Sequence, residues 1–155
     1  MAHPHRLRGI GRQAPDGRGA DPDLVGSVRN ILAATGLGPS RLRLGFPTEA
    51  VLADLGETVD NLHLLAEIGV DAELQGFGAG GDVVCLVDVP VRTVRIAPRL
   101  AERRTEPLAE RTLRNLIDTA TMAGVTVIAD GIDSTGDAGW WQSVGAHIGA
   151  GRYFG

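Results

Sequence analysis

The chain has 155 residues, a length that fits one domain and allows roughly two thirds of the surface of the unfolded chain to be buried. Hydrophobic residues make up 43% and charged residues 22%, as in ordinary soluble globular proteins, and no apolar run reaches the ~18 residues of a transmembrane helix. The net charge of −4 also argues against a nucleic-acid-binding surface, which needs concentrated basic charge. We therefore expect neither a membrane span nor nucleic-acid binding.

The single cysteine, Cys85, excludes an internal disulfide and a cysteine metal cluster, which fits a cytoplasmic location. Free cysteine is usually buried, so we expect Cys85 in the core. All 15 basic residues are arginine, and together with the many glycines this bias suggests a high-GC bacterial genome.

Residues 1–20 are rich in Arg, Gly and Pro, contain few apolar residues and show no periodicity. Such a segment cannot bury enough apolar surface to order itself, so we predict a disordered tail at 1–20 and a domain at 21–155. The tail lacks the apolar region of a signal peptide, so secretion is not indicated.

Amphipathic periodicity predicts helices at 22–35, 48–68 and 105–123, and a last helix is expected around 137–144. Gly36, Gly69 and Gly124 follow the first three helices, where glycine often ends a helix in the left-handed conformation.

Strands are predicted at 41–46, 70–75, 93–97, 125–129 and 147–149, whereas 82–88 is ambiguous between a helix and a strand. The alternation of strands and helices predicts a parallel sheet with helical crossovers. The strand at 70–75 runs into Gly76-Phe77-Gly78-Ala79-Gly80. Glycines let the backbone turn sharply at the carboxyl end of a strand, where α/β folds place their chemistry.

Five segments in this order resemble the EAL family, the (β/α)-barrel phosphodiesterases that hydrolyse cyclic di-GMP: Leu42 to Glu49, Gln75 to Gly80, Val94 to Ala97, Ala129 to Asp133, and Ala150-Gly151. The resemblance covers roughly residues 21–155. It implies an α/β fold, an incomplete TIM-type barrel of about five mostly parallel strands, because a closed barrel of this type needs about 250 residues.

The family holds two divalent cations, Mg or Mn, with acidic side chains at strand ends, and these cations activate a water for attack on the phosphodiester. This chain has Gly45 at the first carboxylate position and Gln75 and Gly76 at the paired aspartates. Arg95 stands where the family has a lysine, and Ala150 where it has a late glutamine. Asp130 and Asp133 keep acidic groups where the family has glutamates. The resemblance therefore implies no metal cofactor for this chain.

An incomplete barrel leaves an unpaired sheet edge, so we expect a homodimer or another protein partner to cover it. On the predicted strands, one set of polar side chains shares the face that points into the barrel of the family: Arg43, Glu73, Gln75, Arg95 and Asp130. Either this set is a structural network of ion pairs, in which arginines take the place of the cations, or it is a ligand site. Asp130 and Asp133 are alternatively turn residues, because Asp-Gly is common in turns.

The leading hypothesis for function is a catalytically inactive EAL-like domain that acts as a protein-interaction or ligand-binding module in cyclic di-GMP signalling. Cyclic di-GMP is the candidate ligand, with binding residues expected at Gln75, Gly76, Phe77, Gly78, Arg95, Asp130 and Asp133. The alternatives are a repurposed enzyme that uses Glu73, Arg95, Asp130 and Asp133 as an acid/base pocket, residual phosphodiesterase activity, or a gene fragment with no function of its own.

Overall fold

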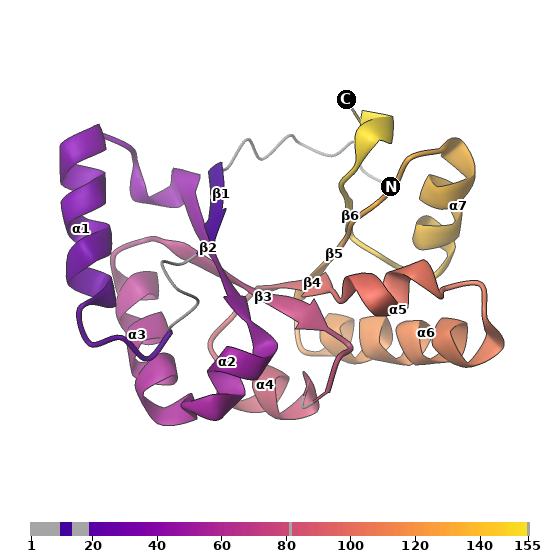
Figure 1. Cartoon of the computed structure of the whole chain (residues 1–155), viewed down its shortest axis with the longest axis horizontal. Coiled ribbons are helices and arrows are strands. Elements are labelled where there is room, and N and C mark those ends of the chain that lie inside the picture. Colours follow the sequence, from indigo (N-terminus) through magenta and orange to yellow (C-terminus); the bar gives the residue numbers. More distant parts are fainter. Residues whose placement is uncertain (1–9, 14–18, 81, 155) are drawn as a thin grey trace.

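Six parallel strands form one sheet in which every strand pairs with its neighbour in the chain (Figure 1). The structure is a computed structural model that describes residues 10–13, 19–80 and 82–154. The strands are β1 (Ile10–Gln13), β2 (Leu42–Pro47), β3 (Asp71–Phe77), β4 (Thr93–Ile96), β5 (Thr126–Ala129) and β6 (Ile148–Gly149).

The helices are α1 (Leu24–Thr35), α2 (Thr48–Ala53), α3 (Leu55–Glu67), α4 (Asp82–Asp88), α5 (Pro98–Glu102), α6 (Pro107–Met122) and α7 (Thr135–Ser143), with short 3-10 turns η2 (Pro39–Arg41) and η3 (Arg152–Phe154). The helices form an outer arc around the strands in Figure 1, so one face of the sheet is covered and the other is the inner face. β1 and β6 are the outermost strands of the described sheet, which does not close into a barrel. The predicted fold class, an incomplete α/β barrel, is confirmed.

Alternation along the strands separates an apolar outer face from a polar inner face, because successive side chains of a strand point to opposite sides. In β2, Leu42, Leu44 and Phe46 are buried in the core, while Arg43 is only partly buried. Leu74 of β3, Val94 and Ile96 of β4, and Val127 of β5 continue this core. Cys85 is also fully buried, as predicted.

The glycines predicted to end helices do so, whereas one predicted helix is divided into two. Gly36 ends α1 at φ 66°, and its N–H donates to the carbonyl of Leu32, while Gly69 follows α3 at φ 84°. The single helix expected at 48–68 is instead broken at Asp54, whose φ of −146° lies outside the helical region, so α2 and α3 run separately. The ambiguous segment at 82–88 is helix α4.

Strand β1 lies within residues 1–20, the segment that composition assigns to a disordered tail. Residues 10–13 pair in parallel with β2, with Ile10 opposite Leu42 and Gln13 opposite Gly45. The edge of a sheet offers unpaired N–H and C=O groups, with which the backbone of an extended segment of any sequence can pair. The composition of residues 10–13 therefore does not reveal that they pair with β2. Residues 1–9 and 14–18 lie outside the described part of the chain.

The described chain resumes at Gly19, ahead of the predicted domain boundary at residue 21. The side chain of Asn61 on α3 donates hydrogen bonds to the carbonyl oxygens of Gly19 at 2.7 Å and Asp21 at 2.9 Å. This buried amide ties the start of α1 to α3, so the domain includes residues that composition assigned to the tail.

At the opposite end of the chain, α7 carries both tryptophans. Trp141 is 2% exposed, and its ring meets that of Trp140 edge to face at a centroid distance of 4.9 Å. The guanidinium of Arg104 lies 6.0 Å from the centre of the Trp140 ring and also pairs with Asp137. None of the helices in the described ranges is long and apolar enough to cross a bilayer.

Candidate functional site

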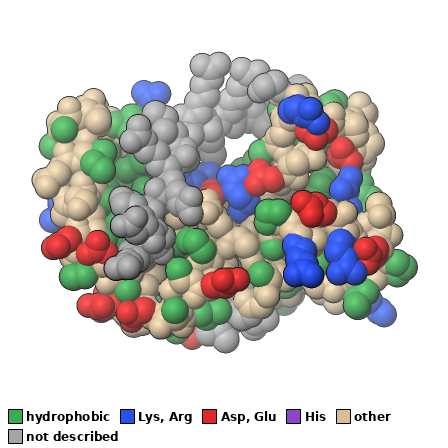
Figure 2. All heavy atoms as spheres, viewed as in Figure 1, with side chains coloured by type: hydrophobic (Ala, Val, Ile, Leu, Met, Phe, Trp, Pro, Cys, Tyr) green, Lys and Arg blue, Asp and Glu red, His purple; other side chains and the backbone are tan. Residues whose placement is uncertain are grey.

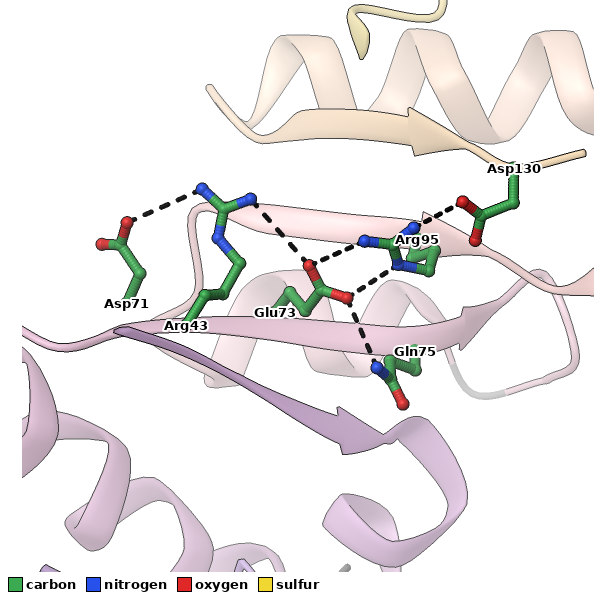
Figure 3. Close-up of polar contacts among 6 residues, drawn as sticks. All are labelled: Arg43, Asp71, Glu73, Gln75, Arg95 and Asp130. Carbon is green, nitrogen blue, oxygen red and sulfur yellow. Dashed lines mark hydrogen bonds and ion pairs between the residues drawn. The ribbon is translucent and has the colours of Figure 1, made fainter. Parts of the chain in front are cut away.

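Polar side chains gather on the inner face of the sheet, along its central strands (Figure 3). They come from β2, from β3, from β4 and from the residue after β5, and we call them the charged cluster: Arg43, Asp71, Glu73, Gln75, Arg95 and Asp130. Parallel register brings them together, because Gln75 lies opposite Arg95 and Arg43 lies opposite Asp71. The sequence prediction that Arg43, Glu73, Gln75, Arg95 and Asp130 share one face agrees with this geometry.

Glu73 is the centre of the charged cluster. Its side chain is 5% exposed, and a buried carboxylate is costly unless a partner compensates its charge. Arg95 supplies that partner: Nε donates to Oε1 of Glu73 at 2.7 Å and Nη2 donates to Oε2 at 3.3 Å. The pair has the two-point geometry that guanidinium and carboxylate favour.

Arg95 also binds a second acid. Its Nη1 donates to Oδ1 of Asp130 at 2.5 Å, so one guanidinium connects Glu73 within β3 to the residue that follows β5. Burial by itself lowers the pKa of Arg95, but the hydrogen bonds to Glu73 and Asp130 outweigh this effect and raise the pKa above its ordinary value. Arg95 is therefore a permanent cation between two carboxylates.

Arg43 is the less well satisfied arginine of the cluster. Its terminal nitrogens lie 3.7 Å from Oδ2 of Asp71 and 4.0 Å from Oε2 of Glu73, beyond hydrogen-bond distance. Its Nε atom is buried and has no hydrogen-bond partner among the described residues. Arg43 is thus held by longer ion-pair contacts, and its side chain as a whole is 19% exposed.

Gln75 fills the space in front of Gly45. A Cβ atom built on Gly45 would lie 2.1 Å from Nε2 of Gln75, so the amide occupies the volume that a side chain on Gly45 would need. The amide also donates to Oε1 of Glu73 at 3.4 Å. Gly45 and Gln75 stand at two positions where the resembled family has carboxylates. Neither side chain is acidic here, and the amide of Gln75 packs over Gly45.

These residues do not fit a pair of divalent cations. Hard cations prefer several anionic oxygens, and the described ranges contain no group of three His, Cys, Asp or Glu side chains placed to hold a metal ion. The carboxylates of Glu73 and Asp130 are instead occupied by the guanidinium of Arg95. Charge on the inner face is therefore balanced by arginine.

Asp133 makes its contacts away from this cluster. Both of its carboxylate oxygens accept hydrogen bonds from Arg152, with Oδ2 at 3.0 Å from Nη2, and this contact holds the pKa of Asp133 below its usual value. The structure thus brings together three of the four candidate catalytic residues and places the fourth in an exposed pair.

The predicted glycine loop serves packing as well as turning. Phe77, expected among ligand-binding residues, is fully buried in the core. Gly78, at φ 103°, lies so close to Leu100 that an added Cβ would be 2.6 Å from a methyl carbon of that side chain. Gly76, at φ 80°, lines a cavity on the helix side of the sheet.

Two features of this region were missed by sequence reasoning. Asp71 belongs to the charged cluster, and its position two residues before Glu73 on the same strand face was a signal that could have found it. Helix α5 was also missed, although Pro98 at its first turn is a common helix-start signal.

Comparison with known proteins identifies the family of this partial α/β barrel. The EAL domain family matches residues 15–155, so the chain belongs to the EAL domain family. Among curated relatives, it is 28% identical over 116 residues to a signalling protein of Caulobacter vibrioides, covering 74% of this chain and 14% of that protein. It is 26% identical over 140 residues to a protein of Mycobacterium tuberculosis, covering 86% of this chain and 46% of that protein. The chain spans less than half the length of these relatives.

Solved structures agree on the fold. The chain superposes on the PaMucR phosphodiesterase in complex with c-di-GMP with a TM-score of 0.81 at 19% identity, covering 89% of this chain and 57% of that one. It superposes on the FimX EAL domain with a TM-score of 0.80 at 18% identity, covering 89% and 56%. The EAL enzyme Bd1971 in its form with cAMP and cyclic di-GMP bound gives 0.82 at 18% identity, covering 93% and 38%.

Replacing Arg95 with alanine tests whether the cluster is organised by ion pairs. The variant leaves Glu73 buried without its cation, so we expect the free energy of unfolding to fall by about 3 to 5 kcal/mol. The second substitution Glu73→Gln should restore part of this loss, because it removes the uncompensated charge. Urea denaturation measures both values.

The matched control is Arg114→Ala, which removes the exposed pair with Glu110 on α6 and an exposed hydrogen bond to the carbonyl of Ser143. It should cost about 1 kcal/mol or less. Equal losses for the Arg95 and Arg114 variants would contradict the central role of Arg95.

Proposed function

We propose that this chain is a non-hydrolytic EAL domain that acts as a ligand-binding module in cyclic di-GMP signalling. The observation that carries the proposal is the position of Arg95, whose guanidinium lies between the carboxylates of Glu73 and Asp130. Two structural relatives, the PaMucR phosphodiesterase and FimX of Xanthomonas citri, are described as complexes with c-di-GMP, which supports the choice of ligand.

Hydrolysis by the resembled family depends on cations that activate a water. Here a guanidinium neutralises the acids through directed hydrogen bonds and offers no Lewis-acid site for water. Gln75 packed over Gly45 adds to this argument, because neither residue supplies an anionic oxygen. The charged cluster therefore supports binding better than cleavage.

The alternative of a repurposed acid/base enzyme receives less support. The carboxylate oxygens of Glu73 and Asp130 are occupied by hydrogen bonds from the same guanidinium, that of Arg95. Asp133 is engaged by Arg152, and its lowered pKa makes it a weaker base than an ordinary carboxylate at neutral pH.

Arg43 is the group that would receive an anionic ligand, because its donors are not saturated within the described part of the chain. We expect calorimetry to detect cyclic di-GMP binding in the absence of divalent metal. Arg43→Ala should weaken that binding about ten-fold, since a charge-assisted contact to phosphate is lost. Arg29→Ala on the exposed face of α1 is the control and should leave affinity unchanged.

Absence of binding, or equal affinity of the wild-type chain and the Arg43 variant, would contradict the ligand assignment.

Turnover is a separate measurement. We expect incubation of the chain with cyclic di-GMP and either Mg²⁺ or Mn²⁺ to give no more linear product than a protein-free blank, because the cluster lacks the carboxylates for two cations. Metal-dependent cleavage that Asp130→Asn abolishes would show instead that the domain is a phosphodiesterase.

We further propose that another polypeptide segment covers an outer edge of the open sheet. The pairing of β1 with β2 shows that this edge accepts a short parallel strand, and a β2 edge without such a strand would expose its N–H and C=O groups. The partner is either a second copy or a strand from a different protein.

Deleting residues 1–18 tests this edge, because it removes β1 and uncovers the four residues of β2 that pair with it, Leu42 to Gly45. We expect the shortened chain to self-associate more strongly in light scattering than the full chain, since an unpaired edge recruits other strands. Deleting residues 1–9 keeps β1 and is the matched control. Identical scattering of the two deletions would show that the β2 edge does not drive association.

A further inference from the structure

Arg95 binds two carboxylates that differ in their exposure to solvent. The side chain of Glu73 is 5% exposed, whereas that of Asp130 is 42% exposed. Figure 2 shows basic and acidic side chains next to one another in the hollow at the centre of the view, where β4 and β5 lie in Figure 1. A molecule that approaches Arg95 from solvent therefore meets the carboxylate of Asp130 before that of Glu73.

Asp130 accepts a hydrogen bond from the nitrogen that Glu73 leaves open. Glu73 takes the Nε and Nη2 side of the guanidinium, through contacts of 2.7 and 3.3 Å, and Asp130 takes Nη1 at 2.5 Å. A guanidinium binds a phosphate group best through two neighbouring N–H groups that point the same way. The Nη1 and Nη2 side of Arg95 has that geometry, and Asp130 occupies one of its two nitrogens.

Asp130 is also the acid that can exchange for a ligand. Without Arg95, the carboxylate of Glu73 would be a buried and uncompensated charge, which is strongly unfavourable. Asp130 is exposed enough to be hydrated, and ion pairs at such positions contribute little net stability. An incoming anion would therefore displace Asp130 and leave Glu73 in place.

A second ion pair restrains the segment that carries Asp130. Asp137, in the first turn of α7, pairs with Arg104, and these two side chains are only 21% and 26% exposed. Oδ2 of Asp137 also accepts a hydrogen bond from the backbone N–H of Asp133 at 3.3 Å. The carboxylate of Asp137 thus joins the loop between β5 and α7 to the residue two positions beyond α5.

Arg104 and the middle of this loop are fixed by further contacts. Nη1 of Arg104 donates to the carbonyl of Ala101 at 3.3 Å, and the guanidinium lies 6.0 Å from the centre of the Trp140 ring. Ile132 is buried, and its N–H donates to the carbonyl of Ala150 at 3.1 Å. The loop is therefore restrained on the side of Asp130 that leads to α7, which keeps the carboxylate of Asp130 beside Arg95.

We propose that Asp130 is a built-in competitor of the anionic ligand: its carboxylate occupies the Arg95 donor that a phosphate group would take, and the Arg104–Asp137 pair keeps it there. This inference rests on the proposed function, because it requires that an anion enters the charged cluster. Binding then exchanges one ion pair of Arg95 for another, so the affinity is lower than that of an uncovered Arg95. Asp130 thus limits binding, whereas the sequence predicts that it contacts the ligand.

Calorimetry with cyclic di-GMP, without divalent metal, tests the competitor. Asp130→Asn and Asp130→Ala should each bind about ten-fold more tightly than the wild-type chain, because a like charge is removed and Nη1 of Arg95 is released. If Asp130 instead supports the structure or contacts the ligand, both substitutions weaken binding. Asp118→Asn on the exposed surface of α6 makes the same change in net charge and should leave the affinity unchanged.

The restraint is tested by Asp137→Asn, which should bind about three-fold more tightly, because the loop then holds Asp130 less firmly. The double variant with Asp130→Asn should bind no more tightly than Asp130→Asn alone, since Asp137 acts only through Asp130. Glu106→Gln is the matched control, because it removes the exposed ion pair of Arg103, the residue next to Arg104, and should have no effect.

Pyrophosphate is the second probe, because it offers phosphate oxygens without bases. If no variant binds cyclic di-GMP but Asp130→Asn binds pyrophosphate more tightly than the wild-type chain does, the competitor is supported and the ligand assignment fails. If the wild-type chain binds cyclic di-GMP and the Asp130 variants bind it equally or more weakly, the competitor is overturned and the proposed function stands. Absence of binding of both probes to every variant would overturn both proposals.

Discussion

The contact between Glu73 and Arg95 is the constraint on which the rest of the inner face depends. A carboxylate with 5% of its side chain exposed requires a cation at hydrogen-bond distance, and Arg95 on the neighbouring strand supplies it. This requirement fixes which residue of β3 lies beside which residue of β4. A slip of one position would turn Arg95 towards the apolar core, so the pair specifies strand register as well as charge balance.

The same guanidinium connects Glu73 to a second acidic side chain. Asp130 after β5 shares Arg95 with Glu73, and Arg43 on β2 approaches Glu73 from the other side. Four successive segments of the sheet are thereby connected by ion pairs across the inner face. Such connections compensate one another's charge, and Nε of Arg43 is left without a hydrogen-bond partner among the described residues.

Strand periodicity and the family motifs were sufficient to predict the parallel sheet and the inward set of Arg43, Glu73, Gln75 and Arg95, because side-chain direction follows from a period of two. The pairing of β1 could not be predicted, since an edge accepts backbone groups and residues 10–13 show no apolar alternation. Likewise, Asp133 depends on a loop that brings Arg152 beside it, and spacing along the sequence does not reveal that contact. Local pattern predicted strands well and predicted the loops that follow them poorly.

The placement of both tryptophans on α7 has a spectroscopic consequence. Indole emission depends on burial and on nearby charge, and here one ring is buried while the other lies beneath the guanidinium of Arg104. Intrinsic fluorescence of this chain therefore reports on the carboxyl-terminal part of the sheet alone. Detachment of β1 or fraying of α1 would leave the emission spectrum unchanged, and a folding experiment needs a second probe, such as circular dichroism, to observe the amino-terminal part.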